Sequence, residues 1–207
     1  MEKMKSKHLK NRIKNGDTVI GSWITLAHPS IAEIMAMAGF DWLAIDLEHS
    51  VITIREAEEL IRVIDLAGVV PLVRLTSNNP DQIKRVMDAG AHGVIVPMVM
   101  SAQDAELAVA SVKYPKKGSR SIGLARAQGY GVTFDEYFEW QKDNTLVIVQ
   151  IEHIDAVADI DAIFNVDGVD GFFIGPNDLS GSMGIPRQLA RKEYKDAVER
   201  VKEAGLV

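Results

Sequence analysis

Four side chains in this sequence are of types that perform chemistry, and each stands at or near the end of an apolar run. Glu152 is the second-last residue of VIVQIEH (147–153), and Asp178 follows GFFIGPN (171–177). His49 ends WLAIDLEH (42–49), and Arg74 ends the run VPLVR (70–74). Polar side chains at the carboxyl ends of successive parallel strands form the active sites of α/β barrels. Two carboxylates, one histidine and one arginine predict a metal ion, a proton carrier and an anion clamp.

Each of these residues also has a purely structural explanation. Glu152 or Asp178 alone is better explained as a helix cap or a loop anion, whereas the pair at corresponding strand ends favours Mg²⁺ or Mn²⁺. His49 alone is better explained as a loop histidine bonded to backbone. A salt bridge to a neighbouring acid explains Arg74 as well as anion binding does.

Two local segments add to the candidate site without settling it. In the segment that contains Asp46, Glu48 and His49, the strand register decides which side chains point inward. The turn Gly-Pro-Asn-Asp (175–178) precedes a helical segment. Its backbone N–H groups can bind an oxyanion, but it is equally explained as a tight strand-to-helix turn.

The composition narrows the class of protein. The chain has 207 residues, of which 47% are hydrophobic and 25% charged, with a formal net charge of −6. These values predict a globular protein and exclude nucleic acid as a partner, because its binding needs a basic face. The sequence contains no cysteine, so no disulfide or thiolate site exists. The charged amino terminus lacks a signal peptide and no apolar run could span a bilayer, so we expect no membrane partner and a cytoplasmic location.

The apolar runs alternate with helical segments at intervals of roughly 25 residues, which is typical of βα units. Continuous apolar strands indicate a parallel sheet buried on both faces. The strands are expected at 19–25, 41–49, 69–75, 93–99, 145–153 and 169–178. The helices are expected at about 6–15 and at 30–39, 53–68, 79–90, 101–113, 133–144, 154–165 and 187–205, with a long loop at 116–131.

These elements predict one domain over residues 1–207 with an α/β fold. Six βα units suit either a doubly wound sheet or a TIM (β/α)₈ barrel truncated after about six units. The absence of G-x-G-x-x-G after the first strand, together with polar residues at several strand ends, favours the barrel. A seventh strand is expected to start after Gly205.

The ordered set of segments resembles the HpcH/HpaI aldolase family, the class II pyruvate aldolases that act on 2,4-dihydroxyhept-2-ene-1,7-dioate. The matching segments are GSWITLAHPSIAEIMAMAGFDWLAIDLEHS (21–50), PLVRLTSNNPDQIKRVMDAGAHGVIVPMV (71–99), VIVQIEH (147–153) and GFFIGPNDLS (171–180). The resemblance implies a homo-oligomeric barrel, a hexamer or trimer of dimers. It also implies reversible cleavage of a 4-hydroxy-2-oxo acid to pyruvate and an aldehyde with Mg²⁺, Mn²⁺ or Co²⁺.

The resemblance further implies the roles of individual residues. Glu152 and Asp178 would hold the metal ion, with Gln150 lining its site. Arg74 would contact the keto oxygen of pyruvate. His49 would belong to the base system, oriented by Asp88 and with Asp46 nearby. Gly175, Asn177 and Asp178 would offer backbone N–H groups to the substrate carboxylate.

The sequence departs from the family at its end, because two further βα units are expected after Val207. Two alternatives therefore stay open beside the aldolase. One is an acyl-CoA lyase similar to the citrate lyase β subunit, which would share the Arg, Glu and Asp positions. The other is a truncated barrel that binds metal or a partner without turnover.

Overall fold

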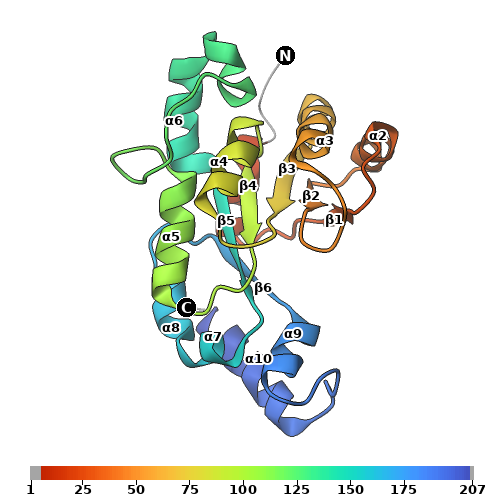
Figure 1. Cartoon of the computed structure of the whole chain (residues 1–207), viewed down its shortest axis with the longest axis vertical. Helices are drawn as coiled ribbons and strands as arrows, with labels where there is room; N and C mark the ends of the chain where they lie inside the picture. Colours follow the sequence, from red (N-terminus) through yellow and green to blue (C-terminus); the bar gives the residue numbers. More distant parts are fainter. Residues whose placement is uncertain (1–5, 206–207) are drawn as a thin grey trace.

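A computed structural model describes residues 6–205, in which six strands alternate with helices along the chain (Figure 1). The strands are β1 (Gly21–Ile24), β2 (Trp42–Asp46), β3 (Val70–Arg74), β4 (Gly93–Val96), β5 (Leu146–Ile151) and β6 (Gly171–Ile174). The helices are α1 (Ser6–Lys14), α2 (Pro29–Met37), α3 (Ile54–Leu66), α4 (Pro80–Asp88), α5 (Ala102–Val112), α6 (Phe134–Asn144), α7 (Ile154–Ala158), α8 (Ile160–Phe164), α9 (Pro176–Ser182) and α10 (Lys192–Ala204), with a 3₁₀ segment η1 (Arg126–Gly131).

The six strands form one parallel sheet in the unbroken order β1-β2-β3-β4-β5-β6. A doubly wound sheet would reverse its strand order at a switch point, so this order excludes that alternative. The sheet curls into an open half-barrel, and β1 and β6 do not pair with each other within residues 6–205. The expected α/β architecture of about six barrel units is thus confirmed.

Local sequence explains why the helices begin where they do. At the start of α3, the Thr53 hydroxyl accepts from the Glu56 N–H, and the Glu56 carboxylate accepts from the Thr53 N–H at 2.7 Å. This reciprocal capping satisfies N–H groups that have no partner within the helix. At α4, Asn79 caps the helix and Pro80 occupies its first position, where the lack of an N–H costs nothing.

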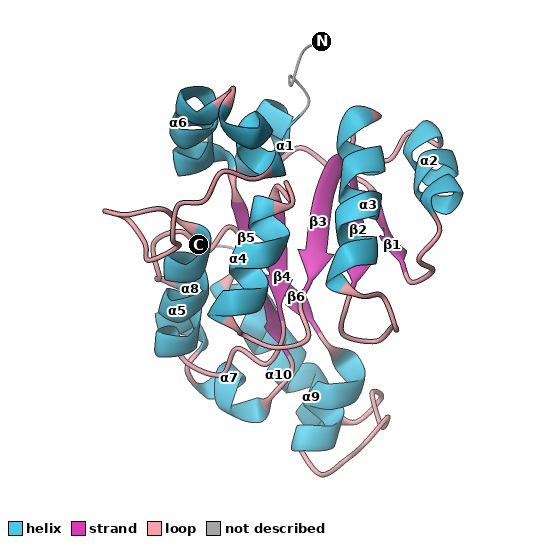
Figure 2. Ribbon diagram, turned by 45° about the horizontal axis from the view of Figure 1, so that its top comes forward, coloured by secondary structure: helices cyan, strands magenta, loops and turns pink. Residues whose placement is uncertain are grey.

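The two faces of the sheet pack against different partners. The convex face carries buried side chains such as Leu43, Val73, Val94 and Val149, which form the main core together with residues of α3, α4 and α5 such as Ile61, Ile83 and Ala108. The concave face holds a smaller cluster of Ala44, Leu72, Ile95 and Leu146, closed by Leu9 of α1. In Figure 2, α1 and α6 lie beyond the end of the sheet where the strands begin. The opposite, carboxyl end of the strands is the end left for chemistry.

Several element boundaries differ from those expected. The helix at 154–165 is two helices, α7 and α8, which meet at Asp159; its carboxylate accepts from the Ala102 N–H at 3.0 Å. The strand expected at 169–178 ends at Ile174, because Pro176 starts α9. The last helix begins at Lys192 rather than 187. The start of a seventh strand falls on residues 206 and 207, outside the described residues.

Candidate active site

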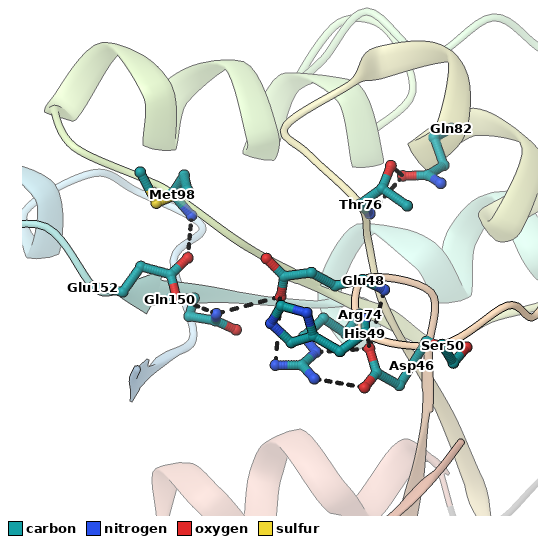
Figure 3. Close-up of polar contacts among 10 residues, drawn as sticks. All are labelled: Asp46, Glu48, His49, Ser50, Arg74, Thr76, Gln82, Met98, Gln150 and Glu152. Atoms are coloured by element: carbon teal, nitrogen blue, oxygen red, sulfur yellow. Dashed lines mark hydrogen bonds and ion pairs between the residues drawn. The ribbon is translucent and has the colours of Figure 1, made fainter. Parts of the chain in front are cut away.

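The centre of the candidate site is an ion pair between the last residues of two neighbouring strands. The sheet register places Asp46 of β2 directly opposite Arg74 of β3, on the concave face. Arg74 Nε donates to Asp46 Oδ1 at 2.9 Å, and Arg74 Nη2 lies 2.5 Å from Asp46 Oδ2 (Figure 3). The guanidinium also stacks on Trp23 of β1, at 4.5 Å from the ring centroid. A bidentate pair stacked on an aromatic ring fixes the plane of the guanidinium.

Asp46 also shapes the loop that follows its strand. Its Oδ1 accepts from the backbone N–H groups of Glu48 at 3.0 Å and His49 at 3.1 Å. Burial by itself would raise the pKa of Asp46, but the hydrogen bonds from Arg74 and from these N–H groups outweigh it and lower the pKa. Asp46 is therefore a charged anchor with both carboxylate oxygens occupied, which suits a positioning role.

Glu48 is the residue whose direction the sequence left open and to which no role was assigned. Its Oε2 lies 3.4 Å from Arg74 Nη1 and accepts from Gln150 Nε2 at 3.4 Å. Burial and the nearby charge of Glu152 raise the pKa of Glu48, only partly offset by Arg74. Glu48 lies two residues after Asp46 and faces the same side, which is the side that strand alternation predicts although β2 ends at Asp46.

Glu152 follows β5 and is almost fully buried. Its Oε1 accepts from the Met98 N–H at 2.7 Å, and its Oε2 accepts from Gln150 Nε2. Met98 donates from a left-handed backbone conformation with φ of 52°, which is uncommon for a residue other than glycine. On the other side, a Cβ added to Gly175 would lie 2.5 Å from Glu152 Oε2. Glycine at 175 thus lets the β6–α9 turn approach this carboxylate.

The charges and polar atoms around Glu152 fit a divalent cation. Asp46, Glu48 and Glu152 gather around one cation, Arg74, so the cluster carries an excess of negative charge. Gln150 Oε1 is buried and has no hydrogen-bond partner among the described residues, although buried polar atoms are normally paired. Oxygen donors of this kind are those that Mg²⁺ and Mn²⁺ prefer. Within residues 6–205 no three His, Cys, Asp or Glu side chains are grouped so that they could hold a metal ion by themselves.

The other residues of the predicted metal and substrate site lie at the start of α9. Asp178 and Asn177 are exposed in its first turn. Among the described residues, the Asp178 carboxylate forms no hydrogen bond or ion pair. The Gly175 N–H donates to Ile151 O at 3.1 Å, so of the three predicted N–H groups only those of Asn177 and Asp178 remain open.

The two residues of the predicted base system are far apart. His49 lies at the carboxyl edge, with 63% of its side chain exposed and its Nε2 3.9 Å from Glu48 Oε2. Asp88 ends α4, just before the chain returns to the start of β4, at the opposite edge of the sheet. Asp88 Oδ1 is buried there with no hydrogen-bond partner within residues 6–205, and burial raises the pKa of this carboxyl. The structure thus gathers Asp46, Arg74, Gln150 and Glu152 at one edge of the sheet. His49 lies at that same edge, whereas Asp88 lies at the opposite one.

The fold, with polar side chains gathered at the carboxyl ends of its strands, is typical of an α/β-barrel enzyme. Residues 19–206 match the family model described as HpcH/HpaI aldolase/citrate lyase, and the chain belongs to this family. It is thereby a carbon–carbon lyase of the class II aldolase type. Class II aldolases of this family depend in general on a metal ion.

Individual relatives agree with this assignment. A hydroxypyruvate/pyruvate aldolase of Sagittula stellata is 41% identical over 194 residues, covering 91% of this chain and 76% of the relative. A 4-hydroxy-2-oxo-heptane-1,7-dioate aldolase of Salmonella typhimurium is 40% identical, covering 92% of this chain and 73% of the relative. The crystal structure of a family member from Burkholderia cenocepacia superimposes with a TM-score of 0.90 at 33% identity, covering 96% of this chain and 80% of that one.

Proposed function

We propose that the protein is a metal-dependent aldolase that reversibly cleaves a 4-hydroxy-2-oxo acid to pyruvate and an aldehyde. The observation that carries the proposal is the arrangement around Arg74, a guanidinium held in one plane beside Glu48, Gln150 and Glu152. Two relatives, a hydroxypyruvate/pyruvate aldolase and a 4-hydroxy-2-oxo-heptane-1,7-dioate aldolase, support 2-oxo acids as the substrate class.

Arg74 is the residue to which we assign binding of the substrate's keto oxygen. Two of its nitrogens are engaged by Asp46, and the guanidinium faces the same concave edge as Glu152. N–H groups held in advance where negative charge develops lower the barrier, because they need no reorganisation during the reaction. Arg74 would therefore bind the keto oxygen of the 2-oxo acid and stabilise the enolate that forms when the C3–C4 bond breaks.

Glu152 and Asp178 would hold the metal ion, with Gln150 Oε1 facing the same space. The ion, Mg²⁺, Mn²⁺ or Co²⁺, would act as a Lewis acid that polarises the 2-oxo acid. The substrate carboxylate would be bound by the open N–H groups of Asn177 and Asp178. This assignment gives Gly175 a spacing role, since any side chain there would displace Glu152.

His49 would remove the proton of the C4 hydroxyl, because it lies at this edge of the sheet beside Glu48. The carboxylate that lies next to it in the same chain is Glu48, at 3.9 Å. Asp88 is separated from it by the length of the sheet, about 15 Å for five residues. A role for Asp88 in the base system would therefore require a neighbouring copy of the chain, in agreement with the expected homo-oligomer.

Exchange of the C3 protons of pyruvate in D₂O, followed by NMR, tests enolate formation without knowledge of the aldehyde. We expect exchange with Mg²⁺ or Mn²⁺ and none with EDTA. Glu152→Gln and Arg74→Gln should each lower the exchange rate at least about 100-fold. Glu58→Gln, on the exposed face of α3, is the control that should leave the rate unchanged. Absence of exchange in a folded, metal-supplemented sample would reject the proposal, and turnover that requires a CoA thioester would replace it with the acyl-CoA lyase.

A further inference from the structure

An aromatic pair spans the opening between the two edge strands of the sheet. Trp23 lies on β1 and Phe173 on β6, and their ring centroids are 5.7 Å apart with the ring planes tilted by 56°. Aromatic rings attract each other at such separations. Within residues 6–205 these two strands do not pair with each other. The ring contact therefore joins two strands that the sheet itself leaves unconnected.

The sheet register explains how Trp23 reaches Arg74, which lies two strands away. Trp23 of β1 is directly opposite Ala44 of β2, whose side chain is a single methyl group. Two residues further along β2, Asp46 is opposite Arg74 of β3. The indole can thus extend across β2 over Ala44, and the Arg74 guanidinium carbon lies 4.5 Å from the centroid of its ring. Trp23 covers a face of the guanidinium, while Asp46 holds its edge.

Phe173 points to the concave side of the sheet, with 37% of the residue exposed. Its neighbour Phe172 points to the convex side, where it packs against the main core and its ring stacks on Phe164 of α8. Consecutive residues of a strand alternate in direction, which agrees with both contacts. In the register, Phe173 is opposite Gln150 of β5. Phe173 thus belongs to the lining of the half-barrel beside the candidate active site and not to the core under the helices.

The position of Trp23 at an edge of the sheet makes this contact important. β1 has a strand neighbour on one side only, so no further strand of the described chain packs beside Trp23 on the other side. Phe173 supplies a contact from the opposite edge. The attraction between an aromatic ring and a guanidinium requires that the cation stay over the ring face, so an indole that turns away loses it.

We propose that Phe173 is a positioning residue of the aldolase reaction, which acts through Trp23 on Arg74. Phe173 holds the indole over the guanidinium, and the guanidinium thereby keeps its direction toward the keto oxygen, where negative charge develops. This inference rests on the proposed function, in which Arg74 binds that oxygen. Phe173 itself contacts neither the substrate nor the metal ion.

The NMR resonance of the Arg74 Nε–H group reports on this arrangement in the protein alone, without substrate or metal. Its loss in Arg74→Lys assigns it. Because the Trp23 ring lies over the guanidinium, its ring current shifts this resonance, and Trp23→Leu gives the unshifted value. We expect Phe173→Leu to move the resonance toward that value. Phe173→Tyr, which keeps the ring, and the control Phe172→Leu should both leave it in place. An unchanged resonance in Phe173→Leu would overturn the proposal.

Exchange of the pyruvate C3 protons with saturating Mg²⁺ tests the consequence for the reaction. Phe173→Leu should lower the maximal exchange rate about fivefold with little change in the KM for pyruvate, because the direction of Arg74 matters most once charge develops. Phe172→Leu and Phe173→Tyr should keep the wild-type rate, and thermal melting verifies that each variant is folded. In a Trp23→Leu background, Phe173→Leu should lower the rate by less than about twofold. A fivefold loss in that background would show that Phe173 acts without Trp23 and would overturn the proposal.

Failure of this proposal and failure of the aldolase function give different results. A wild-type exchange rate in Phe173→Leu would overturn the positioning role and leave the aldolase function intact. Absence of exchange in the wild-type protein would reject the aldolase function, and the positioning role in the reaction would fall with it. In that case the Arg74 resonance still shows whether Phe173 holds the guanidinium in place.

Discussion

Replacing Asp46 by Asn tests whether this residue is the anchor of Arg74. The substitution keeps the shape of the side chain and an oxygen for the N–H groups of Glu48 and His49. It removes the charge that binds Arg74 Nε and Nη2 at 2.9 and 2.5 Å. With the amide oxygen at the Oδ1 position, the NH₂ group replaces Oδ2 and faces Arg74 Nη2, from which it cannot accept, so that bond is lost.

The magnitude follows from how deeply the pair is buried. The Asp46 side chain is 3% exposed and that of Arg74 is 12% exposed. Breaking a buried ion pair by removing one partner costs about 3–5 kcal/mol, and the partial hydration of Arg74 places this case near the lower end, about 3 kcal/mol. A guanidinium released from its plane would also lose its alignment with the substrate oxygen, which lowers the rate of pyruvate proton exchange at least about 100-fold.

Urea unfolding of Asp46→Asn, Arg74→Gln and the double variant measures the coupling between the two residues. We expect the free energies of unfolding to be non-additive by about 2–3 kcal/mol. Glu48→Gln is the matched control, because it also removes a carboxylate beside Arg74. The contact that it removes is the longer one, 3.4 Å from Arg74 Nη1, so the substitution should lower the free energy of unfolding by less than about 1 kcal/mol. Additive effects within about 0.5 kcal/mol, or a normal exchange rate in Asp46→Asn, would refute the anchoring role.

Three further predictions concern other parts of the molecule. Gly175→Ala places a Cβ 2.5 Å from Glu152 Oε2 and should abolish metal-dependent pyruvate exchange; a wild-type rate would exclude the close approach as a requirement. Burial and the charge of Lys10 lower the pKa of Lys113 from 10.5 to about 8. Between pH 8 and 10.5 the Lys113 amine is therefore more protonated in the unfolded chain than in the folded one, so the free energy of unfolding should rise with pH by up to about 3 kcal/mol. Urea titrations at pH 8, 9 and 10 should find this rise in the wild type and not in Lys113→Met. Thr53→Ala should lower the free energy of unfolding by about 1 kcal/mol, because the α3 cap is lost, and should leave the pyruvate exchange rate unchanged. Thermal melting measures the first effect and NMR the second, and a clearly larger change in either quantity would contradict the prediction.

The strands and the polar residues that end them could be predicted because both are properties of short segments. Continuous apolar runs located all six strands, and parallel pairing then placed Arg74, Gln150 and Glu152 on one edge. The direction of Glu48 was left open, because it lies two residues beyond the end of β2 and the sequence does not show whether alternation continues that far. There the Asp46 carboxylate, through two N–H groups, sets the direction of the chain, and this contact is not visible in a pattern of alternation.

The position of Asp88 shows a different limit. Its segment matches the expected helix, yet the end of a helix that follows a strand lies at the start of the sheet, away from His49. The division of the helix at 154–165 also depends on a distant contact, the bond from the Ala102 N–H to Asp159. Sequence patterns thus predict the elements well, whereas their ends and their partners depend on contacts between segments far apart in the chain.

The left-handed backbone of Met98 has a consequence for the evolution of this fold. A non-glycine residue in this conformation costs about 1 kcal/mol or more, and here its N–H is aimed at Glu152. Glycine at 98 would relieve that cost in the folded state but would loosen the β4–α5 connection that delivers the N–H. Selection for stability alone would favour the relaxed loop. Selection for turnover would keep a residue with a Cβ, which restricts the backbone there, although Met98 itself is 44% exposed. At position 98, variants selected for heat resistance should therefore carry a different residue from variants selected for rate.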